Sequence, residues 1–317
     1  TCSIKDQTNR VDEFIKTESQ VYHMESDKSK RGLILFSDGS SLKRVNQEGQ
    51  VFHITGKATT KGYKDGKDGD ARFNKITGFV QIPLRKSWAV VVADKDNDCL
   101  RVVDRLRKQK VRTFAGQCRQ PGFKNSILDL EKGLFNKPHS IIADMKAENQ
   151  LVITDKSNDA VRMISYPPYK PGEKIGLSGN LTTLFKSAVR LHSPRGIVQS
   201  MPSGDYYISV IQAIVILRYS DHKVSYMTPH PGITYPYEMI FVSDTHMLAG
   251  SVTFLTLISS THVTRLCSRA NKKYPFVPGN LYNSSCRMDY PYSLLLSADR
   301  LYVGQRVAIN VISSAGE

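Results

Sequence analysis

Short segments that alternate hydrophobic and polar residues fill the chain, and turns rich in Gly, Asn and Asp separate them. The segment 110–116 is an example, while 33–38 is a short apolar run that ends in Ser and Asp. Alternation with a period of two predicts half-buried β-strands. The longest apolar run, 206–217, is interrupted by Ser209 and Gln212, so it is too short and too polar to span a bilayer. The pattern therefore predicts a protein made of many short strands.

One phrase occurs twice, at 70–104 and at 132–164. Each copy has Phe-Asn-Lys, an apolar strand, a polar turn, a β-rich strand that ends in Asp94 or Asp155, then Lys-x-Asn-Asp and a further strand. A third, outer strand follows each copy. Four antiparallel strands per unit, repeated at a period of roughly 40–60 residues, are typical of the blades of a β-propeller.

The whole chain divides into six such units. Their approximate bounds are 20–56, 75–116, 137–186, 193–228, 235–267 and 290–314. The last unit has three strands, whereas an extra strand at 10–16 precedes the first unit. We expect this N-terminal strand to complete the last blade, which removes the free sheet edges. The sequence therefore predicts an all-β fold, a six-bladed β-propeller, as a single domain over residues 1–317.

The second unit resembles the NHL repeat. The matching residues run from Gly62 to Asn74 and continue in 93–97, 100–104 and 113–116. The resemblance is strongest over 56–165, partial in the first unit and poor from about residue 200 onward, where the Asp and Asn of the turn are lost. NHL proteins form six-bladed propellers, so the resemblance implies the blade count that the repeats give independently.

The acidic and amide residues of the repeated turn have a structural interpretation. Asp and Asn side chains accept or donate hydrogen bonds to nearby backbone groups and stabilise tight turns. We therefore expect a framework role, rather than a catalytic one, for Asp38, Asp94, Asp155, Asn97 and Asn158.

Charge indicates the chemistry of a partner. The 317 residues include 44 Lys and Arg against 29 Asp and Glu, a net charge of +15, while 40% are hydrophobic, enough for a sizeable core. This excess of positive charge predicts an acidic partner or surface, such as a sulfated glycan, acidic lipid headgroups or an acidic protein. A basic patch is predicted at Arg101, Arg105, Arg107, Lys108, Lys110 and Arg112. A second basic group comprises Arg265, Arg269, Lys272 and Lys273.

Cysteines and sequons favour an oxidising compartment. We expect disulfides Cys99–Cys118 and Cys267–Cys286, with Cys2 left over. Two glycosylation sequons begin at Asn180 and Asn283. The chain begins without an initiator Met, as a mature secreted protein or an ectodomain would. The localisation predicted is therefore secreted or on the cell surface.

Alignment of the six units predicts a ring of side chains at one mouth of the central channel. Its members are Tyr22, Thr77, His139, Arg195, Tyr237 and Tyr292. Such a ring could hold an acidic or aromatic group by hydrogen bonds and cation–π contacts. The alternative is that these side chains only fill the taper of the channel and bond its water.

The NHL family includes an enzyme, the peptidyl-hydroxyglycine alpha-amidating lyase, whose central zinc is held by three His. The resemblance implies that His139 lies on one such strand, but Thr77, Arg195, Tyr237 and Tyr292 stand at the equivalent positions of other blades and are poor zinc ligands. No G-x-S-x-G elbow, P-loop or H-E-x-x-H motif is present. The sequence predicts no metal and no cofactor.

The function predicted is a non-catalytic extracellular binding module that recognises a protein or an acidic glycan through an end face. Two alternatives stay open. One is a lyase- or hydrolase-type enzyme that uses the channel mouth. The other is an intracellular RNA-binding NHL propeller, which would explain the net charge by nucleic-acid binding.

Overall fold

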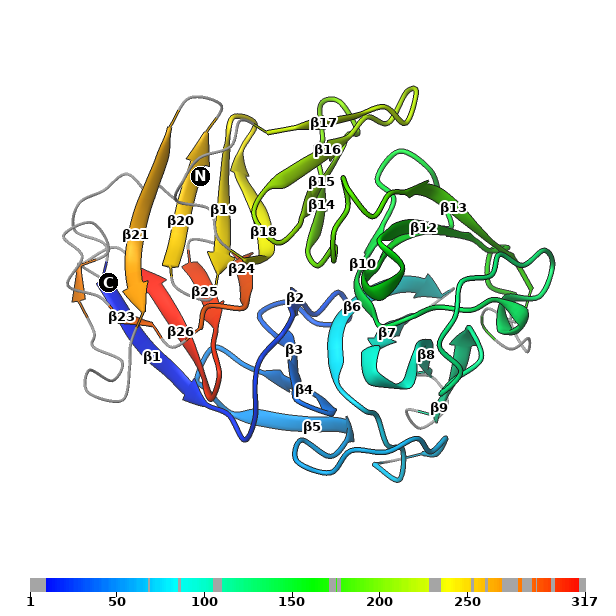
Figure 1. The fold of residues 1–317 in the computed structure, drawn as a ribbon. Helices are drawn as coiled ribbons and strands as arrows, with labels where there is room; N and C mark the ends of the chain where they lie inside the picture. Colours follow the sequence, from blue (N-terminus) through cyan, green and yellow to red (C-terminus); the bar gives the residue numbers. More distant parts are fainter. Residues whose placement is uncertain are drawn as a thin grey trace.

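The computed structural model describes residues 10–313 except 68, 85–86, 105–109, 171–174, 176–177, 228–234, 252–253, 260–261, 270–278, 281–286, 289 and 298–299. Six sheets are arranged radially, and no α-helix occurs among the described residues. Figure 1 shows the innermost strands β2, β6, β10, β14, β18 and β24 surrounding the centre of the ring. The prediction of an all-β, six-bladed propeller is confirmed.

The first three blades each contain four antiparallel strands in sequence order. Blade 1 comprises β2 (Met24–Ser26), β3 (Ile34–Asp38), β4 (Ser41–Val45) and β5 (Val51–Gly56). Blade 2 comprises β6 (Ile76–Leu84), β7 (Ser87–Asp94), β8 (Cys99–Asp104) and β9 (Lys110–Ala115). Blade 3 comprises β10 (Pro138–Ala143), β11 (Gln150–Asp155), β12 (Ala160–Ser165) and β13 (Asn180–Lys186).

The other three blades vary more. Blade 4 comprises β14 (Ile197–Gln199), β15 (Tyr206–Ser209), β16 (Ile214–Leu217) and β17 (Val224–Tyr226). Blade 5 comprises β18 (Pro236–Ser243), β19 (His246–Ser251), β20 (Phe254–Ser259) and β21 (Val263–Arg269), with β23 (Arg287–Met288) added in parallel to β21. Blade 6 comprises β24 (Ser293–Ser297), β25 (Arg300–Gly304), β26 (Ala308–Ser313), β1 (Arg10–Lys16) and β22 (Gly279–Asn280).

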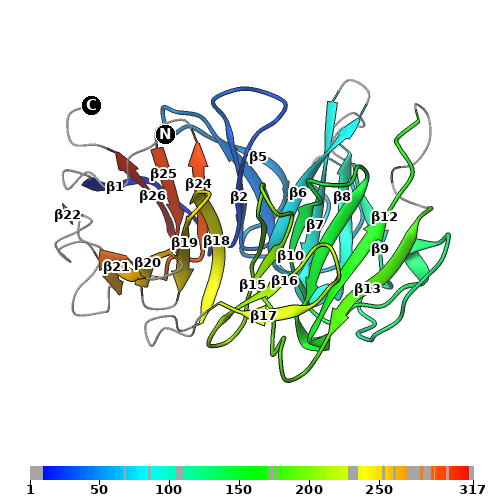
Figure 2. The same cartoon turned by 90° about the horizontal axis from the view of Figure 1, so that it is seen from above.

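The N-terminal strand closes the ring as predicted. β1 pairs antiparallel with β26, in a register that runs from Val11 opposite Ile312 to Lys16 opposite Ala308. Both views show blue β1 beside red β26 (Figures 1 and 2). The first and last parts of the chain therefore share one sheet, which covers an edge that would otherwise be open to pairing with another chain.

A buried apolar cluster lies between each pair of neighbouring blades. Phe79 and Leu35 belong to the cluster between blades 1 and 2, and Phe135 to the one between blades 2 and 3. Tyr302 and Phe36 join blade 6 to blade 1. Because every blade buries apolar side chains on both faces, the core is a series of interfaces around the ring rather than one central mass.

The repeated Asp ties each early blade to the segment that leads into its inner strand. Asp94 Oδ1 accepts a hydrogen bond from the Asn74 amide at 2.7 Å, and Asp155 Oδ1 accepts one from Asn136 at 2.8 Å. Asn97 donates to the other oxygen of Asp94 at 2.8 Å. These bonds fix where the inner strands begin, as the framework interpretation predicts.

Candidate functional site

The structure brings the predicted ring of side chains together at one end of the channel. Tyr22, Thr77, His139, Tyr237 and Tyr292 line one small cavity of about 10 Å³. The Tyr237 ring lies 4.5 Å from that of Tyr292, edge to face, and Tyr292 lies 5.7 Å from Tyr22. The guanidinium of the sixth member, Arg195, stacks over Tyr237 at 4.5 Å. Whether the ring binds a ligand stays a prediction.

Hydroxyl groups of one blade hold the ring residues of the next. Thr77 Oγ1 donates to the carbonyl of His139 at 2.8 Å, and Thr154 Oγ1 donates to the carbonyl of Arg195 at 2.6 Å. Gly196 has no Cβ, and one placed there would overlap the carbonyl oxygen of Tyr237. The backbone of the ring residues His139 and Arg195 is therefore held by hydroxyl groups of the preceding blade, and their side chains take no part in these bonds.

Four lysines join the ring from two kinds of turn that the sequence analysis did not single out. Lys75 and Lys137 precede inner strands and have left-handed backbones, with φ of 85° and 56°. Lys95 and Lys156 begin the short 3-10 turns η1 (Lys95–Asn97) and η3 (Lys156–Asn158). The Lys95 amide donates to the Lys75 carbonyl at 3.0 Å, which places two cations side by side. The signal was present in the phrases Phe-Asn-Lys and Asp-Lys-x-Asn.

These lysines and the ring residues are called the basic mouth below. Burial, together with the nearby charges of Lys95, Arg195, Lys137 and Lys75, lowers the pKa of Lys156 to about 8. Burial and Lys95 also lower the pKa of Lys75. Burial and the charges of Lys95, Lys156, Arg195 and Lys75 hold the pKa of His139 well below its usual value, so the imidazole is neutral at neutral pH. The field at this mouth is positive enough to disfavour protonation of its own side chains.

Several polar atoms of the basic mouth have no protein partner. Lys75, Lys156 and Arg195 form no ion pair in the described part of the chain; Lys95 contacts Asp96 at 2.9 Å. The buried Nδ1 of His139 and the Nε and Nη1 of Arg195 form no hydrogen bond there. Unpaired positive and polar groups of this kind are stabilised by an anion that accepts hydrogen bonds.

A buried ion pair crosses the channel behind the ring. His23, next to Tyr22, pairs through Nδ1 with Glu238, next to Tyr237, while the other carboxylate oxygen of Glu238 accepts from the Leu294 amide at 3.0 Å. Burial alone would lower the pKa of His23, but Glu238 and Glu25 outweigh it and raise that pKa to about 10. No sequence signal indicated this pair, because its members lie on blades 1 and 5.

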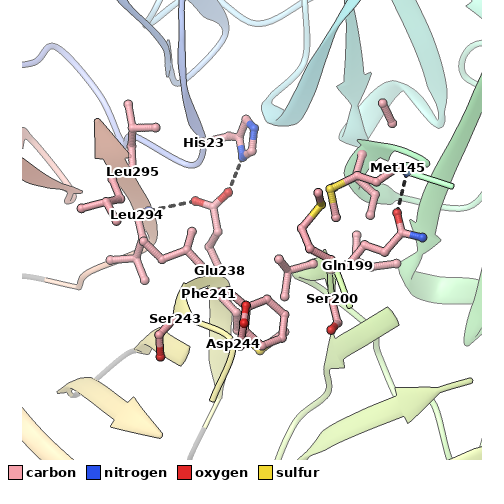
Figure 3. A pocket seen from close by; sticks show the side chains of 18 of the residues that line it. His23, Met145, Gln199, Ser200, Glu238, Phe241, Ser243, Asp244, Leu294 and Leu295 are labelled. Carbon is pink, nitrogen blue, oxygen red and sulfur yellow. Dashed lines mark hydrogen bonds and ion pairs between the residues drawn. The ribbon is translucent and has the colours of Figure 1, made fainter. Parts of the chain in front are cut away.

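A larger cavity of about 410 Å³ opens on the other side of this pair. It is lined by residues farther along the inner strands, including Ile142 of β10, Val198 of β14, Phe241 of β18 and Leu295 of β24. Figure 3 shows the Glu238 carboxylate between His23 and Leu294, with Met145, Gln199 and Ser200 on the facing wall. The residues at the starts of the inner strands form the basic mouth, and the residues toward their ends form this apolar pocket.

The predicted basic patch is wrong at Arg101. Its side chain is fully buried and pairs with Asp94 at 3.2 Å and with Asp65, against the ring of Phe73. Arg162 has the same place in blade 3, where it pairs with Asp155 at 2.9 Å. Residues 99–103 of β8 are all buried, so Arg101 cannot meet a partner. Lys110 is exposed and Arg112 half-buried, whereas Arg105, Arg107 and Lys108 lie outside the described residues.

The second basic group falls mostly outside the described part. Arg265 stacks over Phe254 at 4.3 Å on blade 5, and Arg269 ends β21. Lys272 and Lys273 lie outside the described residues.

One predicted disulfide is confirmed. Cys99 and Cys118 are bonded, with Cα atoms 4.9 Å apart. Cys267 is disulfide-bonded, but Cys286 and Cys2 lie outside the described residues, so the pair Cys267–Cys286 stays a prediction. Asn180 is partly exposed at the start of the outer strand β13.

Metal-binding groups and membrane-spanning helices bear on what the protein can do. None of the described residues forms a group of three or more His, Cys, Asp or Glu side chains that could hold a metal ion. Asn283 of the second sequon lies outside this part of the chain. Among the same residues, no helix has the length and apolar character that crossing a membrane requires.

Comparison with known proteins shows the fold and no family. No family model matches the sequence, and no curated protein is similar to it in sequence. The resemblance to the NHL repeat therefore stays a prediction. Several solved structures are similar in fold, at identities that say nothing about function.

The similar structures have different activities. A gluconolactonase from Xanthomonas campestris has a TM-score of 0.62 at 12% identity, over 97% of this chain and 90% of that one. Virginiamycin B lyase from Staphylococcus aureus has a TM-score of 0.58 at 11% identity, over 96% and 99%. A chain of a nidogen/laminin complex has a TM-score of 0.55 at 13% identity, over 86% and 84%. This chain therefore has a propeller fold that is shared by enzymes and by a protein of a binding complex.

Proposed function

We propose that this protein is a secreted or cell-surface binding module that recognises an acidic group, carried by a protein or a glycan, through the basic mouth. The observation that carries the proposal is the convergence of Lys75, Lys95, Lys137, Lys156 and Arg195 around a ring of tyrosines, with few carboxylates to balance them. A sulfate or carboxylate placed there would accept hydrogen bonds from groups that otherwise have no partner.

The aromatic side chains support the same function. Burial raises the pKa of Tyr22 and Tyr292, so both phenols stay protonated and add no negative charge that would repel an anion. The disulfide Cys99–Cys118 and the net charge of +15 support an extracellular setting and an acidic partner. The nidogen/laminin neighbour is a precedent for this fold in protein binding and no more.

Binding of a heparin-derived oligosaccharide and of a poly-glutamate peptide at physiological salt tests the proposal. We expect Arg195→Ala and Lys156→Ala each to weaken binding about tenfold, because each removes one charge-assisted contact. Lys132→Ala is the matched control, since its side chain is 74% exposed at the outer rim of blade 3. It should leave binding unchanged.

The two probes separate the sources of the acidic group. Binding of the oligosaccharide alone would assign a glycan, and binding of the peptide alone would assign a protein. If neither probe binds, or if Lys132→Ala weakens binding as much as Arg195→Ala, the basic mouth is not the recognition site. An RNA probe that binds more tightly than both would favour the nucleic-acid alternative.

A further inference from the structure

The apolar pocket is a blind cavity at the end of the channel opposite the basic mouth. Five of the six innermost strands or their flanking residues supply its walls, from Met24 on β2 to Leu296 on β24. The His23–Glu238 pair lines it on the side of the basic mouth and is called its floor below; Glu238 also lines the small cavity of that mouth. Its volume, about 410 Å³, lies in the range of roughly 300–1,000 Å³ that is usual for small-molecule sites.

Most polar groups of the pocket are already satisfied by the protein; the exception is the buried Nε2 of His23, which forms no hydrogen bond in the described part of the chain and lies 3.8 Å from Glu25. Glu238 uses both oxygens, one on His23 and one on the Leu294 amide. Gln199 accepts from the Met145 amide at 2.7 Å and donates to Asp144 and to the Gly204 carbonyl, both at 3.0 Å. A charged ligand would therefore lose its water for one available partner, the His23 Nε2, whereas a largely apolar ligand would leave the other polar groups paired as they are.

The rest of the lining is aliphatic, aromatic and rich in thioethers. Met24, Met145, Met201 and Met239 all contribute. Met145 and Met201 at the rim are 47% and 66% exposed, which leaves apolar surface in water unless something covers it. Methionine adapts its shape to irregular apolar partners. Ser243 and Asp244 give the rim a polar edge.

We propose that this pocket binds a neutral, largely apolar small molecule, which enters from the end opposite the basic mouth and rests on the His23–Glu238 floor. The site is separate from the one in the proposed function and does not depend on it. A small molecule fits better than a protein segment, because five of the six inner strands supply the walls of a cavity of about 410 Å³, which is a usual size for a small-molecule site.

Titration of the complete chain with the neutral fluorophore N-phenyl-1-naphthylamine tests the site. We expect saturable binding of one molecule per chain. Met201→Glu puts a carboxylate on the rim at an already exposed position, and Val198→Trp fills the lumen. Each should weaken binding by at least about tenfold. Val189→Glu, at a position 87% exposed and outside the pocket, is the control and should bind as the unchanged protein does.

Three outcomes would overturn the proposal. The fluorophore fails to saturate, or both pocket variants bind it as well as the unchanged protein does, or Val189→Glu weakens binding equally. Suppose that the fluorophore does not bind, and that a protein partner binds the unchanged protein but not Met201→Glu. The pocket would then hold a side chain of that partner and not a small molecule. Arg195→Ala should leave the fluorophore unaffected, so failure here is distinguishable from failure at the basic mouth.

Discussion

At the scale of single residues, arginine has two different roles, depending on where in a blade it lies. Arg101 and Arg162 are fully buried and neutralise the buried carboxylates of Asp94 and Asp155. Arg195, in contrast, lies at the basic mouth with buried nitrogens that have no partner in the described structure. The first two hold the blades, and the third is available to a ligand.

Removal of a buried arginine should unfold the protein more easily. Arg101→Ala leaves the Asp94 carboxylate without its cation in a fully buried place, at a cost of about 3–5 kcal/mol of unfolding free energy. Urea denaturation measures the loss. The double variant Asp94→Asn with Arg101→Met is expected to recover part of it. A loss below about 1 kcal/mol in the single variant would mean that the pair is not a structural element.

Anion binding at the basic mouth should weaken as the solution becomes alkaline. The pKa of Lys156 is lowered to about 8 by burial and neighbouring cations, so below that pH it carries a charge that attracts an anion. Above it the free protein loses that charge, and binding must then take up a proton. Oligosaccharide affinity measured from pH 7 to pH 9.5 should fall in the unchanged protein and stay flatter in Lys156→Met. Parallel curves for the two would contradict this assignment.

At the scale of elements, the turn before each inner strand has a strained backbone conformation, and this conformation places a side chain at the mouth. Lys75 and Lys137 have left-handed backbones, and so do Ser193, Tyr235 and Tyr290 at the same point of blades 4 to 6. Non-glycine residues adopt this conformation at a cost of about 1 kcal/mol or more. A glycine at one of these positions would remove the energetic cost of the left-handed backbone, but it would also remove the lysine or tyrosine side chain.

Lys137→Gly should therefore separate stability from binding. We expect a gain of up to about 1 kcal/mol in unfolding free energy, because glycine adopts the φ of 56° without strain. Oligosaccharide binding should weaken at the same time. Lys132→Gly, at a turn on the rim of blade 3, should gain no stability and lose no affinity. A destabilised Lys137→Gly would show that the lysine side chain holds the turn.

The same elements show how much of the candidate site could be predicted from the sequence. Alignment of the six units predicted the six ring residues, because each lies near the start of the inner strand of its blade. It did not predict that Arg101 is buried, although the matching Arg162 was visible in the second copy. The pair His23–Glu238 and the apolar pocket could not be predicted, because they join residues far apart in sequence and come largely from blades 4 to 6, where the repeat has faded.

At the scale of the whole molecule, stability depends on one seam. Each of the six interfaces between blades buries its own apolar cluster, but only blade 6 is built from both ends of the chain. Phe14 on β1 packs edge to face on Tyr302 of β25, with ring centroids 5.4 Å apart. This strand therefore joins the two ends of the chain in one sheet.

Deletion of residues 1–16 should expose the edge of β26. We expect a lower thermal midpoint and concentration-dependent association, since an uncovered strand edge pairs with other chains. Light scattering and thermal unfolding measure both effects. A shorter deletion of residues 1–9 keeps β1 and is the control. If the longer deletion stays monomeric and equally stable, the seam contributes little to closure.

The contact between the His23 imidazole and the Glu238 carboxylate has a consequence for how ligands occupy the channel. It lies between the two cavities, so the two ligands proposed above would occupy different sites and would not compete for the same residues. The two proposed sites are therefore separate and lie at opposite ends of the channel.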